Sequence, residues 1–105
     1  MFLVDFKTMH EIMKADNRAD LFIGGGVHSD RKTMRFCRGS YEWLTVPITW
    51  LGLGWRSPDV WPDFDDFEIT DYGQTVRLGE YEFAVDAILY SFDEDYRKKK
   101  DAVKV

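Results

Sequence analysis

Residues that carry covalent or metal chemistry are scarce in this chain of 105 residues. It has one cysteine, Cys37, so a disulfide within the chain is excluded. Arg35 and Arg38 lie close to this cysteine in the sequence, and basic neighbours of this kind can lower the pKa of a thiol, but we expect a small buried thiol rather than a nucleophile. The two histidines, His10 and His28, are not spaced to form a catalytic set with this cysteine.

Long hydrophobic runs are also missing. No apolar run approaches the roughly 18 residues of a membrane-spanning helix, and Asp5 places a carboxylate where a secretory signal has its basic region. Together with the single cysteine, these absences predict a cytoplasmic protein without a membrane contact. Hydrophobic residues still make up 45% of the chain, which is enough for the core of one domain over residues 1–105.

Patterns for catalysis and metal binding are incomplete. His10 falls near Met13 and Lys7 on a predicted helix, with no acid–base partner at helical spacing. Asp63 and Asp65 begin an Asp-x-Asp pattern, but the glycine and distal glutamate of a calcium loop do not follow. We therefore predict no catalytic residue, no metal site and no cofactor.

The run Gly24-Gly25-Gly26 is a further incomplete motif. With Arg31 and Lys32 downstream it has the composition of an anion-binding loop. It lacks the Gly-x-x-x-x-Gly-Lys-Ser/Thr spacing and the helix whose N-terminus would complete a phosphate site. We interpret residues 24–32 as a flexible connection that ends the apolar run Leu21–Ile23.

Tryptophan and proline, in contrast, are concentrated. All four tryptophans and all three prolines fall between Trp43 and Pro62. Trp43 follows a predicted turn on a strand, and we expect it in the core. Trp50, Trp55 and Trp61 are five and six residues apart, which is neither a helical nor a strand period, so at least one should be exposed.

Negative charge is concentrated next to the tryptophans. The formal net charge is −5, of which residues 1–56 contribute +2, residues 57–76 contribute −6 and residues 77–105 contribute −1. A window of this kind creates a local field that steers a basic partner. The alternative is that the acids keep an aromatic loop in solution.

The first helix has the clearest pattern. Thr8 and Glu11 match a Thr-x-x-Glu capping box, and the helix should end near Asn17. Four apolar residues then share one face at helical spacing: Phe6, Met9, Ile12 and Met13.

Two later segments share a hairpin pattern. Residues 33–43 and 75–83 each read Thr-apolar-Arg-apolar and then Gly-x-Tyr-Glu-aromatic. Glycine at the first position of a two-residue loop is typical of a type II′ turn. We predict β-hairpins that turn at Gly39-Ser40 and at Gly79-Glu80.

The remaining elements follow from alternation and charge. We expect a strand at Tyr41–Val46, a short extended piece at Ile48–Leu51, a strand at Phe67–Thr70 and a turn at residues 71–74. Residues 81–92 read as a long strand, with a helix starting at Asp86 as the alternative. Acids at 93–95 and bases at 97–100 predict a C-terminal helix. The predicted fold is α+β: a single antiparallel sheet of four to five strands, the N-terminal helix packed on it, and a short C-terminal helix.

These features favour a small acidic interaction protein. We expect its tryptophan-rich acidic segment to bind a larger protein that has a basic surface, with no direct nucleic-acid contact. It would act as an inhibitor of the immunity or viral counter-defence type. The expected anchors are Trp55, Trp61, Phe64 and Phe67, and the expected charged contacts are Asp63, Asp65, Asp66 and Glu68.

Two alternatives stay open. A nucleotide-binding protein would use Arg31, Arg35 and stacking tryptophans, Trp50 among them. A structural subunit would bury its tryptophans in a self-interface, for example in a homodimer. A further option for the basic strand face that holds Arg31 and Arg35 is contact with the acidic window of the same chain.

Overall fold

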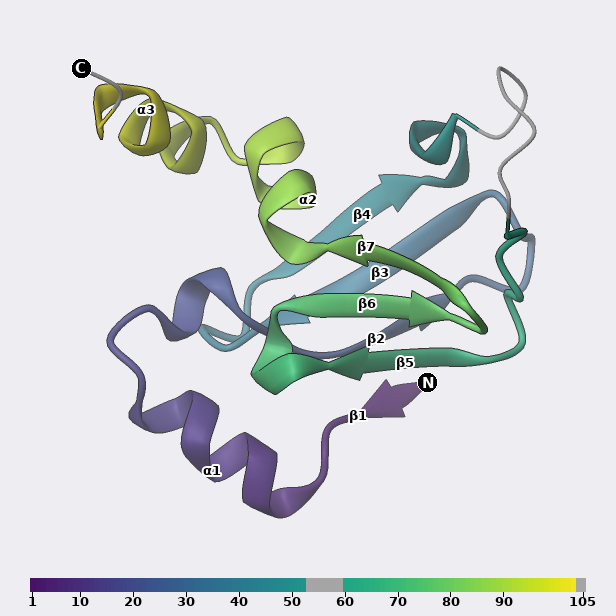
Figure 1. Ribbon diagram of the computed structural model, residues 1–105, viewed down its shortest axis with the longest axis horizontal. Helices are drawn as coiled ribbons and strands as arrows, with labels where there is room; N and C mark the ends of the chain where they lie inside the picture. The colour runs from purple at the N-terminus through teal and green to yellow at the C-terminus, as the bar shows by residue number, and fades with distance from the viewer. Residues whose placement is uncertain (53–59, 104–105) are drawn as a thin grey trace.

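A computed structural model describes residues 1–52 and 60–103. Within these residues the helices and strands are β1 Phe2–Leu3, α1 Phe6–Lys14, β2 Phe22–Val27, β3 Thr33–Arg38, β4 Trp43–Pro47, β5 Phe67–Thr70, β6 Thr75–Leu78, β7 Tyr81–Ala84, α2 Val85–Phe92 and α3 Glu94–Val103 (Figure 1). Short 3-10 helices join some of them: η1 Arg18–Asp20, η2 Ile48–Leu51 and η3 Asp71–Gly73.

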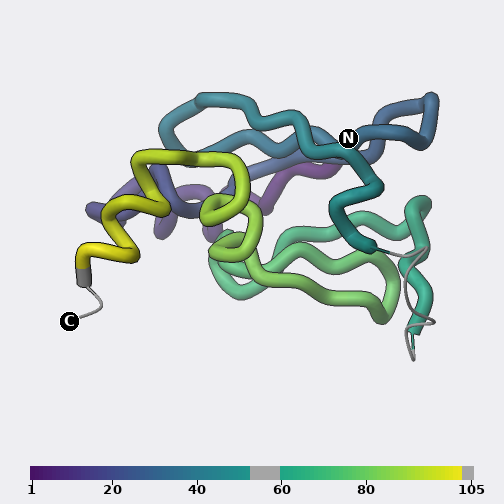
Figure 2. Tube along the Cα trace, turned by 90° about the horizontal axis from the view of Figure 1, so that it is seen from above, coloured from purple at the N-terminus to yellow at the C-terminus, as the bar shows by residue number. Residues whose placement is uncertain are grey.

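The fold is α+β, as predicted, but the strands form two antiparallel sheets instead of one. Sheet A has the order β1-β2-β3-β4 and sheet B has the order β5-β6-β7. The two sheets lie as layers, one above the other (Figure 2). The physical reason is that each sheet has an apolar inner face, and these faces bury one another more completely than a flat single sheet would.

The core fills the space between the layers. Sheet A contributes Phe22, Met34, Phe36 and Val46, sheet B contributes Ile69, Val76 and Leu78, and α2 contributes Val85, Ile88 and Leu89. The ring of Phe36 stacks on that of Phe22 at 4.9 Å and meets that of Phe67 at 5.9 Å between centroids. Aromatic packing therefore joins sheet A to sheet B.

Helix α1 packs beside the sheets, chiefly against η1 and η3. Its N-cap is Asp5, whose Oδ1 accepts a hydrogen bond from the Thr8 amide at 2.7 Å, so the predicted cap at Thr8 is wrong. Of the predicted apolar face only Ile12 is fully buried, and Phe6 is 89% exposed. The helix ends at Lys14, before the expected Asn17.

The glycine run lies inside strand β2, so our interpretation of residues 24–26 as part of a flexible connection is wrong. A Cβ atom on Gly25 would lie 2.3 Å from the Arg35 carbonyl oxygen, and one on Gly24 would lie 2.9 Å from that of Phe2. The neighbouring strands approach too closely for a side chain, and this proximity explains the glycines.

Of the two hairpin turns, one is confirmed. Leu78 pairs with Tyr81, so Gly79-Glu80 is a two-residue loop, and Gly79 has a φ of 65°. The first hairpin instead has a three-residue loop over residues 39–41, in which Tyr41 has a φ of 71°. Gly39 serves a different purpose there, because its Cβ would lie 2.3 Å from the Arg18 carbonyl oxygen.

Residues 81–92 are divided between a strand and a helix, so the long strand is wrong and the helical alternative is closer. Strand β7 ends at Ala84 and α2 begins at Val85. Val85, Ile88 and Leu89 are buried at helical spacing. The expected extended piece at Ile48–Leu51 is the 3-10 helix η2, whereas β5 and the C-terminal helix form as predicted.

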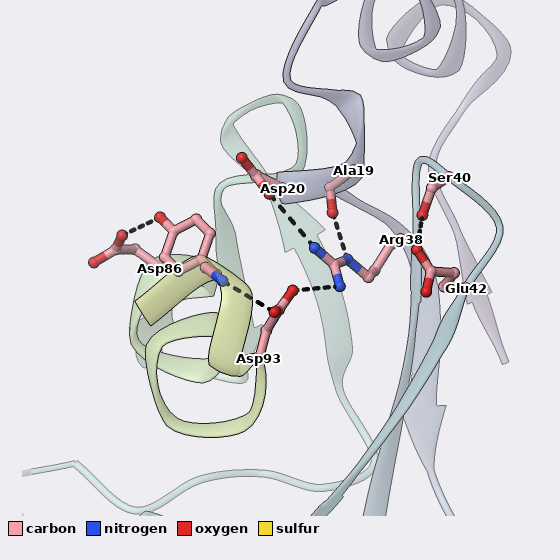
Figure 3. A network of polar contacts seen from close by, with 8 residues as sticks. Ala19, Asp20, Arg38, Ser40, Glu42, Asp86 and Asp93 are labelled. Atoms are coloured by element: carbon pink, nitrogen blue, oxygen red, sulfur yellow. Dashed lines mark hydrogen bonds and ion pairs between the residues drawn. The ribbon is translucent and has the colours of Figure 1, made fainter. Parts of the chain in front are cut away.

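A buried arginine joins the C-terminal helices to sheet A (Figure 3). Arg38 is 8% exposed; its Nη1 donates to Asp93 at 2.8 Å, its Nη2 to Asp20 at 3.4 Å, and its Nε to the Ala19 carbonyl. Asp93 also accepts a hydrogen bond from the Tyr96 amide at 3.0 Å at the start of α3. This backbone bond, and then the Arg38 guanidinium, hold the pKa of Asp93 below its usual range.

We expect Gly25→Ala to lower the free energy of unfolding by about 1–3 kcal/mol, because its Cβ overlaps the backbone of β3. Gly26→Ala is the matched control, since the nearest atom to its Cβ is the Met1 Cα at 3.6 Å, an ordinary contact. Urea unfolding of both variants measures the difference. Equal stability of the two would contradict the packing argument.

We expect Asp93→Asn to lower the free energy of unfolding at neutral pH by about 3–5 kcal/mol, because Arg38 then stays buried without a full partner. Asparagine also caps helices, so the cap itself is retained. The folded pKa of Asp93 is depressed, so its contribution is present above about pH 4 and is lost as the pH falls through the folded value.

The variant should therefore show a weaker loss of stability below pH 4 than the wild type. Asp95→Asn, two residues further along in the first turn of α3, is the control and should change stability by less than about 1 kcal/mol. Urea unfolding at several pH values checks both statements, and an unchanged acid profile in Asp93→Asn would refute them.

Candidate functional site

The segment Asp63–Asp66 forms a turn that leads into β5. Asp63 Oδ1 accepts a hydrogen bond from the Asp65 amide at 3.0 Å, and the Asp66 amide donates to the Asp63 carbonyl at 3.1 Å. The Gly79 amide donates to the Asp66 carbonyl at 2.9 Å. The predicted acidic segment is thereby fastened to the β6–β7 hairpin.

Arginines of the same chain meet several of the predicted carboxylates. Arg31, in the β2–β3 loop, pairs with Asp65. Arg77, on β6, pairs with Glu68 and lies 3.5 Å from Asp66. Contact between Arg31 and the acidic window, one of the options raised by the sequence, is confirmed.

The predicted aromatic anchors have different surroundings. Trp61 is 59% exposed. Phe67 packs between the sheets, 5.9 Å from Phe36 and 6.2 Å from Phe2 between ring centroids, and Phe64 is partly buried against the core. Trp55 lies outside the described residues.

The other two tryptophans lie away from the acidic segment. Trp43 is 45% exposed, so its predicted core position is wrong. Its register opposite Cys37 puts it on the outer face of sheet A, which no helix of residues 1–52 and 60–103 covers (Figure 2), and the Arg35 guanidinium lies 5.0 Å from its ring centroid. Trp50 packs on Phe83 and donates from Nε1 to Ser91 Oγ at 3.0 Å.

The structure therefore brings together only part of the set of residues that was predicted to bind a nucleotide. Within the described residues, no contact joins Trp50 to Arg31 or Arg35. Arg35 lines a pocket, described below, whose aromatic walls are phenylalanines.

Sheet B adds two carboxylates that the sequence reasoning missed. Glu68, Arg77 and Glu82 are cross-strand neighbours on its outer face, and Glu80 lies in the β6–β7 turn. The Gly-x-Tyr-Glu pattern contained this signal, because pairing the hairpin with β5 would have placed Glu82 beside Arg77. We name as the acidic surface the residues Trp61, Asp63, Asp65, Asp66, Glu68, Glu80 and Glu82.

A pocket of about 610 Å³ lies next to the acidic surface, where the two sheets meet the β2–β3 loop. Its apolar lining includes Phe2, Phe64 and Phe67, and its polar lining includes His28, Arg35 and Asp65. This volume lies within the 300–1,000 Å³ typical of small-molecule sites.

A third polar cluster joins α2 to α3. The Tyr96 hydroxyl donates to Asp86, whose Oδ1 also lies 2.8 Å from Lys100 Nζ. Burial, and then the neighbouring Asp86 carboxylate, raise the pKa of Tyr96 to about 12. A tyrosine with this pKa stays protonated at neutral pH, so the cluster is suited to holding the two helices together rather than to accepting a proton.

Neither a metal site nor a membrane span is found in the part of the chain that the structure describes. Residues 1–52 and 60–103 hold no group of three or more His, Cys, Asp or Glu side chains placed to bind a metal ion. The same residues contain no helix with the length and apolar character needed to cross a membrane.

Comparison with known proteins gives no further guide to the site. No known protein family, curated protein or solved structure matches this chain.

We expect ultraviolet titration of the tyrosines to show one group with a pKa near 12, and Tyr96→Phe to remove it. Asp86→Asn should lower that pKa, since it removes the carboxylate that stabilises the phenol. The folded pKa is raised, so the stabilisation is complete below pH 10 and is lost as the pH rises toward 12. A Tyr96 pKa that is unchanged in Asp86→Asn would disprove the contact.

Proposed function

We propose that the protein is a small interaction protein, whose acidic surface binds a basic surface of a larger protein and blocks it. The observation that carries the proposal is the exposure of Trp61, at 59%, beside a group of carboxylates that outnumbers its arginine partners. Six carboxylates lie on this surface, and two arginines, Arg31 and Arg77, pair with three of them.

The remaining negative charge supports a basic partner. Asp63, Glu80 and Glu82 form no ion pair within the described residues. An excess of negative charge at one end of a small protein speeds its encounter with a positively charged partner. Carboxylates in such a group can take the place of phosphates on a surface that normally binds nucleic acid.

The exposed tryptophan supports a contact with substantial affinity. Tryptophan is enriched at the centres of interfaces, where its ring fills a pocket of the partner and surrounding groups exclude water. The charged residues around Trp61 would form the polar rim. The acidic segment is also held in place by its bonds to the β6–β7 hairpin, so little ordering is needed on binding.

In this proposal the protein acts in the cytoplasm and inhibits its partner by covering the partner's basic surface. A protein of 105 residues presents a surface large enough for an interface of standard size. It needs no catalytic group for this task, because occupancy of the basic surface is sufficient.

The test uses variants that leave the intrachain ion pairs intact. We expect the double variant Glu80→Gln/Glu82→Gln to weaken partner binding about tenfold at low salt, since it removes two unpaired carboxylates. Trp61→Ala should weaken binding by at least tenfold, with a change in unfolding free energy of less than about 1 kcal/mol. Pull-down from native lysate at low and high salt, followed by binding assays with the recovered protein, gives the measurement.

The matched control is Asp16→Asn/Asp95→Asn, which removes two carboxylates without ion pairs in the described residues, one just after α1 and one in α3, away from the β6–β7 turn (Figure 1). It should leave binding unchanged. The proposal fails if the control and Glu80→Gln/Glu82→Gln bind alike, or if Trp61→Ala binds normally. A mass in solution that is a multiple of 12.4 kDa and that falls in Trp43→Ala would favour the self-interface alternative instead.

A further inference from the structure

We propose that the pocket beside the β2–β3 loop receives a large apolar side chain, preferably an aromatic one, of the partner that the acidic surface binds. The partner's contact segment then carries such a residue between lysines or arginines. This inference rests on the proposed function, because it names the chemistry of the segment that the acidic surface meets. Its basis is one turn that exposes carboxylates and directs a phenylalanine to the pocket.

The turn Asp63–Asp66 joins the two kinds of residue. Asp63 and Asp65 are exposed, whereas Phe64, between them, is half-buried and lines the pocket. Asp63 holds this arrangement, because its side chain accepts a hydrogen bond from the Asp65 amide at 3.0 Å and its carbonyl accepts one from the Asp66 amide at 3.1 Å. The position of Phe64 relative to the carboxylates is therefore set before a partner arrives, which lowers the cost of binding.

The walls of the pocket suit an aromatic side chain. Phe2, Phe64 and Phe67 line it, and all three pack against the core. The ring of Phe67 lies 6.2 Å from that of Phe2 and 5.9 Å from that of Phe36 between centroids. An aromatic occupant gains apolar burial and ring–ring contacts against such walls. The pocket volume of about 610 Å³ has room for the largest side chain and part of the segment that carries it.

The titratable side chains of the lining already have contacts within the chain. Asp65 pairs with Arg31, and His28 Nδ1 accepts a backbone hydrogen bond within its own loop at 3.3 Å. The Arg35 guanidinium stacks on Trp43, on the outer face of sheet A. The phenylalanine rings are then the main contact surface for an occupant, so the pocket favours a neutral apolar side chain over a charged one.

Continuity with the acidic surface indicates a side chain of the partner rather than a free molecule. Phe64 and Asp65 are successive residues, and both line the pocket. Asp63, the residue before Phe64, forms no ion pair within the described residues. A lysine or arginine bound at Asp63 therefore brings the next residues of its own segment to the pocket, since an extended chain advances about 3.3 Å per residue.

The test uses the full chain and capped pentapeptides of the form Lys-Lys-X-Lys-Lys, in which X is tryptophan or alanine. Two-dimensional NMR locates the binding, and titration gives the dissociation constants. We expect the tryptophan peptide to bind at least tenfold more tightly than the alanine peptide, because only its central side chain fills the pocket. It should also shift the amides of Phe2 and Val27, which line the pocket outside the acidic surface, and the alanine peptide should not.

Phe64→Ala should weaken the tryptophan peptide about tenfold and leave the alanine peptide unchanged, because it removes one wall of the pocket and no charge. Phe6→Ala is the matched control, since Phe6 is 89% exposed on α1 and lies outside the pocket lining. Urea unfolding checks that both variants are folded. The comparison of the two peptides on the wild type needs no variant.

Several results overturn the proposal. Equal affinity of the two peptides does so, as does an absence of shifts at Phe2 and Val27 with the tryptophan peptide at about 10 mM. So does a folded Phe64→Ala variant that binds the tryptophan peptide as tightly as Phe6→Ala does. Binding of uncharged N-acetyltryptophanamide as tightly as the tryptophan peptide assigns the pocket to a free molecule instead. A dimer in solution that becomes a monomer in Phe64→Ala assigns it to a second copy of the chain.

The partner recovered by pull-down separates this inference from the proposed function. If Glu80→Gln/Glu82→Gln and Trp61→Ala weaken its binding while Phe64→Ala binds it normally, the acidic surface is supported and the pocket inference is wrong. If all of these variants bind it normally, both are wrong. If all of them weaken binding and Phe6→Ala does not, both are supported.

Discussion

The structure depends most on the burial of one positive charge. Arg38 lies at the end of β3, and its guanidinium reaches the η1 segment through Ala19 and Asp20 and the start of α3 through Asp93. A buried guanidinium is tolerated only when its hydrogen bonds are complete. Within the described residues, no buried side-chain polar atom lacks a partner. The same strand end brings Gly39 against the Arg18 backbone, so charge and close packing fix one corner of the fold together.

Both candidate sites lie where the sheets meet the β2–β3 loop and the β6–β7 turn, and they share Asp65. That residue belongs to the acidic surface, lines the pocket and pairs with Arg31. The two outer sheet faces differ in a related way. On sheet B, Arg77 lies between Glu68 and Glu82 and pairs with Glu68, while sheet A exposes Arg35 stacked on Trp43. Charge compensation within the chain therefore decides which groups are left for a partner or a ligand.

Local chemistry accounts for what the sequence predicted well. The strand Phe67–Thr70, the Gly79-Glu80 turn and the C-terminal helix each follow from residues next to one another. The predictions that failed concern residues whose environment is set by segments far away in the sequence. Trp43 is exposed because, among the described residues, no layer covers the outer face of sheet A, and the glycines of β2 are fixed by the backbones of β1 and β3. For the site, the sequence located the acidic segment and its pairing with Arg31, but Glu80 and Glu82 join it only through the register of sheet B.

The contact between Arg38 and Asp93 spans 55 positions of the chain, and this separation has a kinetic meaning. The β3–β4 and β6–β7 hairpins close over short loops, so they can form early, whereas a contact between such distant residues must await the closure of a large loop. Until α3 arrives, the end of β3 carries an arginine that lacks its Asp93 partner. Docking of α3 onto the end of β3 should therefore be a late step of folding.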